Sequence, residues 1–138
     1  MKDGILILST GERVMPNMTL GEFTQAFPNA ARAAPIHEKW QTYAINRTTI
    51  DGREFNLSAM FEDGRLLTVG LTDPDLDAQG WDGLTKDAVA KTCATLDQWL
   101  LAQLGATRVR LPWGHVISGP DRDGIPQIVF AYYQPKNW

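Results

Sequence analysis

The chain has 138 residues, of which 43% are apolar, and its 13 basic and 16 acidic side chains give a net charge of −3. This composition excludes a disordered chain, and the length suits a single domain spanning residues 1–138. The basic residues are scattered, which argues against nucleic acid or an anionic membrane as a partner, since both need a concentrated basic surface.

The N-terminal part is predicted to form two short strands and a helix. Residues 5–8 are apolar and typical of a strand, and a second strand follows around residues 13–15. A helix is predicted over residues 19–27, because Thr19 and Glu22 have the spacing of a capping box at a helix start.

Residues 40–72 are predicted to form a three-stranded antiparallel meander. Two turns with the shared pattern Asp-Gly-Arg, at Gly52 and Gly64, separate three segments in which apolar and polar residues alternate. Such alternation is typical of a strand that is buried on one face. The sheet is therefore expected to have one apolar face and one half-polar face.

The length of each turn decides which residues of the meander share a face. With two-residue turns, Ile45 would lie opposite Ser58, and the apolar side chains would be divided between the faces. A three-residue turn, with its glycine in the left-handed conformation, instead pairs Ile45 with Leu57 and Leu57 with Val69. We therefore predict three-residue turns. The half-polar face then carries four polar side chains: Asn46, Thr48, Asn56 and Ser58.

A second, longer helix is predicted over residues 85–104. Thr85 can cap its first turn and Gly105 can end it. Its apolar residues recur every three or four positions and so form one stripe. The stripe consists of Val89, Cys93, Leu96, Leu100 and Leu104. We expect this stripe to pack on the apolar face of the meander.

Two strands are predicted to follow the second helix, around residues 114–118 and 125–133. Pro126 near the start of the last strand favours an edge position or a bulge, because proline cannot donate to a strand ladder. The order of elements predicts an α+β fold. In it, an antiparallel sheet with a central meander and a C-terminal strand pair packs against two helices.

An acidic segment joins the meander to the second helix. Five aspartates lie within fifteen residues, opposed within the segment by Lys86 alone, and Trp81 lies among them. An exposed aromatic ring surrounded by one charge sign is suited to anchor a basic protein surface. The alternative is a solvated lead-in to the helix, with Trp81 covering the core. The predicted partner-binding residues are Asp73, Asp75, Asp77, Trp81 and Asp82, and the second choice is Asn46, Thr48, Asn56 and Ser58.

The first three aspartates of this segment occupy the first, third and fifth positions of a calcium loop. The rest of the pattern fails, because Ala78 replaces the turn glycine and Leu84 replaces the bidentate glutamate. The sequence also contains no glycine-rich phosphate loop and no serine-nucleophile elbow. We therefore expect no metal and no cofactor.

Cys93 could in principle form a nucleophile–base pair with His37 or His115. It lies in the middle of the apolar helix stripe, however, where burial raises the pKa of a thiol and makes it unreactive. A small-molecule binder or enzyme with a pocket between sheet and helices would need polar groups there, and the stripe offers none. We expect that the protein is not an enzyme.

With one cysteine, the chain cannot form an internal disulfide. The apolar stretch near its start has only four residues, too few for the core of a signal peptide, and no stretch approaches the length of a membrane span. These features predict a protein of a reducing compartment, the cytoplasm, without a membrane partner.

Several segments carry a resemblance to a class of bacterial proteins: residues 18–23 (MTLGEF), 61–66 (FEDGRL), 99–105 (with Trp-Leu and Leu-Gly at its ends) and 113–118 (WGHVIS). The chain resembles small immunity proteins that neutralise a toxin delivered by contact-dependent, Rhs or type VI secretion systems. The resemblance implies a protein without activity of its own that binds one cognate toxin domain and covers or distorts its active site. Contact residues differ between such proteins, so none is carried over. The alternative is a secretion chaperone or adaptor that holds an effector through an open sheet face or edge strand.

Overall fold

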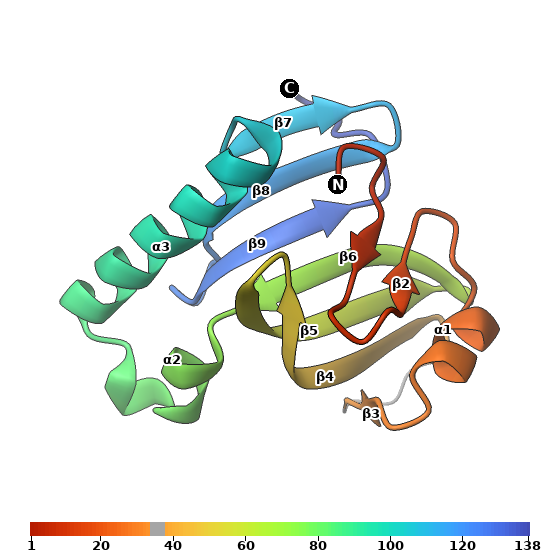
Figure 1. The fold of residues 1–138 in the computed structure, drawn as a ribbon, viewed down its shortest axis with the longest axis horizontal. Helices are drawn as coiled ribbons and strands as arrows, with labels where there is room; N and C mark the ends of the chain where they lie inside the picture. Colours follow the sequence, from red (N-terminus) through yellow and green to blue (C-terminus); the bar gives the residue numbers. More distant parts are fainter. Residues whose placement is uncertain (34–37) are drawn as a thin grey trace.

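The computed structural model, which describes residues 1–33 and 38–138, is built on a seven-stranded antiparallel sheet (Figure 1). The strands are β1 (Leu6–Ile7), β2 (Arg13–Val14), β3 (Ala31–Arg32), β4 (Trp40–Ile50), β5 (Arg53–Glu62), β6 (Arg65–Thr72), β7 (Arg108–Leu111), β8 (Gly114–Pro120) and β9 (Pro126–Ala131). The helices are α1 (Leu20–Ala26), α2 (Pro74–Ala78) and α3 (Lys86–Leu104), with a short 3-10 helix, η1 (Trp81–Gly83). The sheet order is β3-β4-β5-β6-β9-β8-β7, and β1 and β2 form a separate hairpin. The predicted α+β class is confirmed.

The capping box predicted at the start of α1 is present. The Thr19 hydroxyl accepts a hydrogen bond from the Glu22 N–H at 3.1 Å, and the Glu22 carboxylate accepts one from the Thr19 N–H at 3.0 Å. Phe23 then faces the core, with its ring centroid 4.8 Å from that of Phe27 and 5.2 Å from that of Phe61. Local capping thus starts the helix, and aromatic packing attaches it to the sheet.

Both turns of the meander have two residues, so the predicted three-residue turns are wrong. Ile50 pairs with Arg53, and Glu62 pairs with Arg65. Each loop is an Asp-Gly pair in which both residues have positive φ angles, from 45° to 79°. These are the angles of a type I′ turn, whose twist matches that of the flanking strands and which favours Asp-Gly. The apolar side chains must therefore be aligned by another feature.

That feature is a β-bulge in β4. Asn46 and Arg47 together lie opposite the single residue Asn56 of β5, and Arg47 has a φ of 53°. Beyond the bulge, Ile45 pairs with Leu57, so this predicted pair is confirmed. One extra residue inside the strand thus aligns the apolar side chains on one face, an effect that the prediction attributed to an extra residue in the turn.

The bulge also moves one predicted surface residue into the core. Thr48 lies between the bulge and the turn, where it pairs with Phe55 and is 9% exposed. The prediction that Thr48 lies on the half-polar face is therefore wrong. A second irregularity, in β6, pairs Leu57 with Leu71, so the predicted pairing of Leu57 with Val69 is wrong. Because the two partners are two residues apart, both Leu71 and Val69 still lie on the apolar face.

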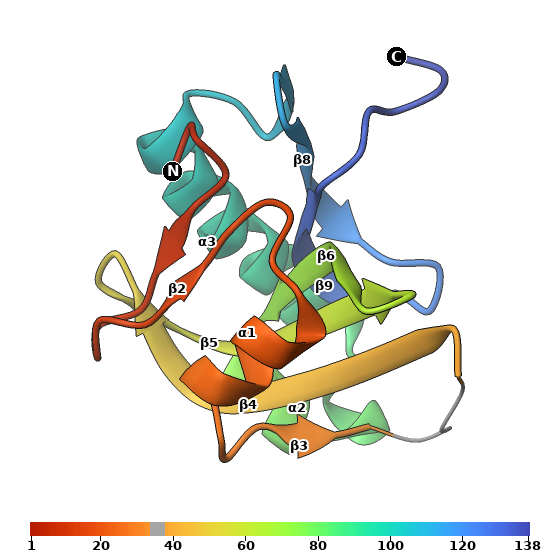
Figure 2. The ribbon, with the colours of Figure 1, turned by 90° about the vertical axis from the view of Figure 1, so that its right-hand side faces the viewer.

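One layer covers the apolar face of the sheet, and it contains α1, the β1–β2 hairpin and α3 (Figures 1 and 2). We predicted that α3 packs on the meander, but it lies mainly across β8 and β9. Leu96 and Leu100 of the predicted stripe are fully buried. Trp99, which lies outside that stripe, is buried with its ring centroid 4.8 Å from that of Phe55.

The C-terminal strands extend the sheet beyond the meander. The two predicted strands are present as β8 and β9, and β7 adds a further strand that we did not predict. Pro126 is the first residue of β9, opposite Pro120, in a strand that lies between β6 and β8. The predicted edge position is therefore wrong. An inner strand tolerates this proline because, at the first position, it leaves the rest of the ladder intact. In the part of the chain that is described, no helix has the length and apolar character needed to cross a membrane.

Candidate protein-binding site

The acidic segment folds into α2 and η1 rather than into an irregular loop. Asp73 is the N-cap of α2, and its Oδ1 accepts hydrogen bonds from the N–H groups of Asp75 and Leu76, both at 2.9 Å. Pro74 takes the first helical position, which needs no N–H donor. Leu76 points inward and is 6% exposed.

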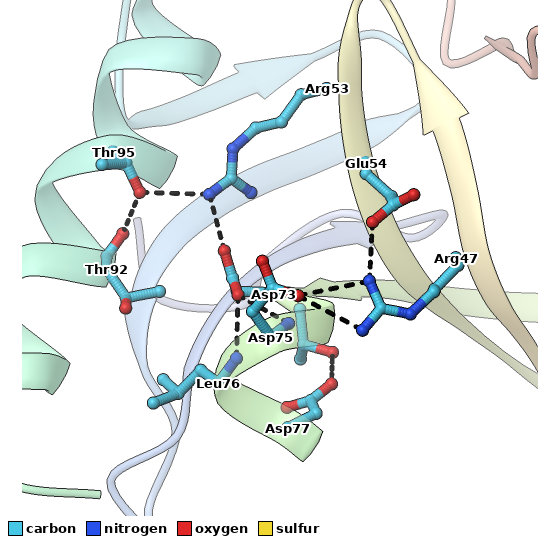
Figure 3. A network of polar contacts seen from close by, with 10 residues as sticks. Arg47, Arg53, Glu54, Asp73, Asp75, Leu76, Asp77, Thr92 and Thr95 are labelled. Atoms are coloured by element: carbon cyan, nitrogen blue, oxygen red, sulfur yellow. Dashed lines mark hydrogen bonds and ion pairs between the residues drawn. The ribbon is translucent and has the colours of Figure 1, made fainter. Parts of the chain in front are cut away.

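The side chain of Arg53, in β5 of the meander, bonds to the N-cap residue of α2 and to a residue of α3 (Figure 3). Nη2 of Arg53 donates to Oδ2 of Asp73 at 3.1 Å and to the hydroxyl of Thr95 at 3.1 Å. The side chains of Arg53 and Asp73 are 20% and 22% exposed, so the ion pair is largely shielded from water. The Arg53 guanidinium also lies 5.0 Å above the ring centroid of Phe55.

The bulge arginine reaches the next aspartate of the segment. The Arg47 guanidinium lies 3.2 Å from Oδ1 of Asp75 and 2.8 Å from Oε1 of Glu54. Hydrogen bonds to Glu54 and then to Asp75 raise the pKa of Arg47. All three side chains are about half exposed or more, so solvent screens this ion-pair network and its contribution to stability is small.

Asp77 joins the acidic segment to the polar face of the sheet. Its Oδ2 accepts hydrogen bonds from Nδ2 of Asn56 at 2.9 Å and from the Thr72 hydroxyl. The two predicted partner-binding surfaces, the acidic segment and the polar face of the sheet, thus meet at Asp77. Asn56 is held further by the Arg47 N–H, which donates to its Oδ1 at 3.0 Å. Asn46 and Ser58 are exposed on the same face.

Three of the five predicted partner-binding residues are therefore engaged within the protein: Asp73, Asp75 and Asp77. Lys86 is the only opposing charge within the segment itself, but Arg47 and Arg53 of the meander form ion pairs with two of the aspartates. The predicted site narrows to the other two residues of the set, Trp81 and Asp82, both of which are exposed.

Trp81 is 71% exposed, so it does not cover the core. Its ring borders a slot of about 200 Å³. The slot is lined by Leu76, Asp77, Gly80, Trp81, Leu84 and Ile125. Ile125 lies just before β9 and was not among the predicted residues, because nothing along the chain indicates that it lines the same slot as Trp81 of η1.

Two of the residues that suggested a catalytic site, Cys93 and His115, lie on different elements, α3 and β8. The His115 ring is buried against the C-terminal segment, with Nδ1 3.0 Å from the Tyr133 carbonyl oxygen and its centroid 4.8 Å from that of Trp138. Cys93 is half buried on α3, and His37 lies outside the described residues. Among residues 1–33 and 38–138, no group of His, Cys, Asp or Glu side chains is arranged to hold a metal ion.

Alkylation of Cys93 by iodoacetamide is expected to need a higher pH in the folded protein than in the unfolded chain. Burial, and then the Asp97 carboxylate, raise the pKa of this thiol, so less thiolate is present at a given pH. The unfolded chain then releases its proton first, and the stability that depends on this thiol declines as the pH rises above the ordinary cysteine value. Rate–pH profiles with and without urea test this, and Cys93→Ser controls for labelling elsewhere. Coincident profiles would contradict it.

Comparisons of the chain with family models, curated proteins and solved structures found no match in any of the three.

Proposed function

We propose that this protein is a non-enzymatic immunity protein that binds and neutralises a cognate bacterial toxin domain through the surface around Trp81. The observation that carries the proposal is the 71% exposure of a tryptophan beside an apolar slot. An exposed tryptophan gains the free energy of burial only when a partner covers it, and tryptophans are enriched among the residues that dominate the binding energy of protein interfaces. The resemblance to immunity proteins gives the class of partner.

The charge around Trp81 favours a basic partner. Asp82 and Asp87 are exposed, and no ion pair is recorded for either within the described ranges. If the toxin is a nuclease, these carboxylates would contact the basic surface with which it otherwise binds phosphates. An immunity protein of this kind needs no cofactor and works in the cytoplasm, where the toxin acts.

The proposal predicts that a gene next to this one encodes a secreted protein with a toxin domain, and that domain is the partner used to test it. Co-expression is expected to restore growth, and the purified proteins are expected to bind. Trp81→Ala and Asp82→Lys should each weaken binding about tenfold or more, because they remove an interface anchor or reverse its charge. Leu101→Ala is the matched control, since Leu101 is an apolar residue of α3 that is 47% exposed and lies outside the slot.

Two outcomes would count against this proposal in different ways. Full affinity of both variants for the toxin domain would remove the Trp81 surface from the interface. A toxin domain that neither binds the wild-type protein nor loses its toxicity would remove the immunity function itself.

A second candidate function is an effector chaperone or adaptor, and an open stretch of β4 favours it. Within the described residues, the chain around β3 contacts β4 at Thr42, Tyr43 and Ala44. The N-terminal hairpin reaches β4 again at Thr49 and Ile50. Between these contacts lies a cleft of about 480 Å³. An extended segment of an effector would add there as a strand. Expression of the toxin's catalytic domain alone separates the two functions, because a chaperone would not protect such cells.

A further inference from the structure

Given the proposed function, we propose that the slot beside Trp81 receives one apolar side chain of the partner, and that lysine or arginine residues flank that side chain. The partner is thus recognised by a short basic–apolar–basic surface motif. This rests on the shape of the slot, on the rigidity of its walls and on a second acidic segment that lies beside it.

The slot has apolar walls from three parts of the chain. Leu76 of α2 is 6% exposed, and Trp81 and Leu84 come from η1 and the residue after it. Ile125, just before β9, lines the slot from a third part of the chain. A volume of about 200 Å³ between these side chains is open to solvent at the molecular surface. An apolar side chain that entered this space would lose its contact with water and cover part of the exposed indole.

The walls are held by polar contacts away from the slot itself. On one side, Asp73 caps α2, and Arg53 bonds to both Asp73 and Thr95 of α3. On the other side, Oδ1 of Asp121 accepts hydrogen bonds from the N–H groups of Asp123 at 2.8 Å and Ile125 at 3.0 Å. The slot therefore exists before a partner arrives, and binding does not have to build it.

The loop between β8 and β9 adds negative charge to the rim. Asp82 follows the lining residue Trp81 in the chain, and Asp123 precedes the lining residue Ile125 by two residues. Both aspartates are exposed. Lys86 and Arg122 are the cations of the same two segments. The four carboxylates Asp77, Asp82, Asp121 and Asp123 outnumber these two cations. A second copy of this chain would bring the same negative rim, so the charges favour a basic partner.

The test uses synthetic pentapeptides as probes. One has a central leucine between pairs of lysines, the second replaces the leucine with glycine, and the third replaces the lysines with glutamates. Binding is followed through the indole N–H signal of Trp81 in ¹H–¹⁵N NMR spectra, which is identified by its loss in Trp81→Phe. The lysine–leucine peptide is expected to shift this signal and to bind at least fivefold more tightly than either of the others.

Filling the slot supplies the matched comparison. Ile125→Phe is expected to abolish the preference for leucine over glycine, while Ile117→Phe, at an apolar position 37% exposed elsewhere on the sheet, should leave it unchanged. Leu84→Phe is the second filling variant if the first does not fold. Absence of a leucine-dependent shift, or equal binding of the acidic peptide, would overturn the inference.

The toxin domain separates this inference from the proposed function. If Ile125→Phe keeps full affinity for the toxin domain while Trp81→Ala loses it, the slot is not used and the proposed function stands. If the wild-type protein does not bind the toxin domain but retains the leucine preference, the proposed function fails and the slot specificity remains.

Discussion

Replacing Gly114 with alanine is expected to lower the free energy of unfolding by about 3 kcal/mol or more, among the largest effects of a single substitution. Gly114 begins β8 and lies directly against the end of β9. A Cβ atom at this position would lie 1.9 Å from the carbonyl oxygen of Ala131 and 3.0 Å from the Tyr133 nitrogen. Both are backbone atoms, so no side-chain rotation can relieve the overlap, and the strands must separate there.

Gly21→Ala is the matched control for that substitution. Gly21 lies in α1, where the nearest atom to an added Cβ is the Thr19 hydroxyl oxygen at 4.0 Å. Alanine is the better helix former, so this variant should be as stable as the wild type or slightly more stable. Chemical denaturation of both variants measures the difference. Equal midpoints for Gly114→Ala and the wild type would show that β8 and β9 do not approach as described.

Replacing Asp73 with alanine is expected to lower the free energy of unfolding by about 2–3 kcal/mol, from two losses that act together. The first is the N-cap of α2, because the Asp73 carboxylate accepts the N–H groups of two later residues. The second is the partner of Arg53, whose side chain is 20% exposed. Nη1 of Arg53 already has no hydrogen-bond partner within the described residues, so the variant leaves a shielded guanidinium with little compensation.

Asp75→Ala tests whether the effect belongs to the position rather than to the loss of a negative charge. Asp75 is 80% exposed and pairs with Arg47 in solvent, so its loss should cost less than about 1 kcal/mol. A double-mutant cycle with Arg53→Met isolates the coupling between Arg53 and Asp73. Equal destabilisation by the two aspartate substitutions would contradict the structural role of Asp73.

Features of the fold that depend on neighbouring residues were predictable from the sequence. The capping box of Thr19 and Glu22 and the glycine end of α3 each depend on a few adjacent positions. The two Asp-Gly hairpins were predicted at the right places, but with turns one residue too long. The bulge at Arg47 was not predictable in this way. The alternation of apolar residues indicates correctly that one extra residue must align the apolar faces. It does not indicate where that residue lies, and the prediction of a longer turn put Thr48 on the wrong face.

The same distinction holds for the site. The sequence singled out Trp81 because its acidic surroundings are visible along the chain, and the structure shows the side chain exposed. The contacts of Asp73 and Asp75 were missed, because Arg53 and Arg47 precede them by 20 and 28 residues and reach them only through the sheet. Ile125 was missed for a similar reason, since no local signal indicates that the start of β9 lies beside η1.

The bulge in β4 also makes that strand tolerant of a change in chain length. If either Asn46 or Arg47 were removed, the other would lie alone opposite Asn56, and Ile45 would remain paired with Leu57. Removal of both residues would instead turn residues 40–45 by half a turn about the strand axis. Tyr43 would then leave its contact with Phe23 and point toward solvent, while Ala44 would take its place inside. Homologous chains should therefore have one or two residues at this place, and chains that lack both should be absent.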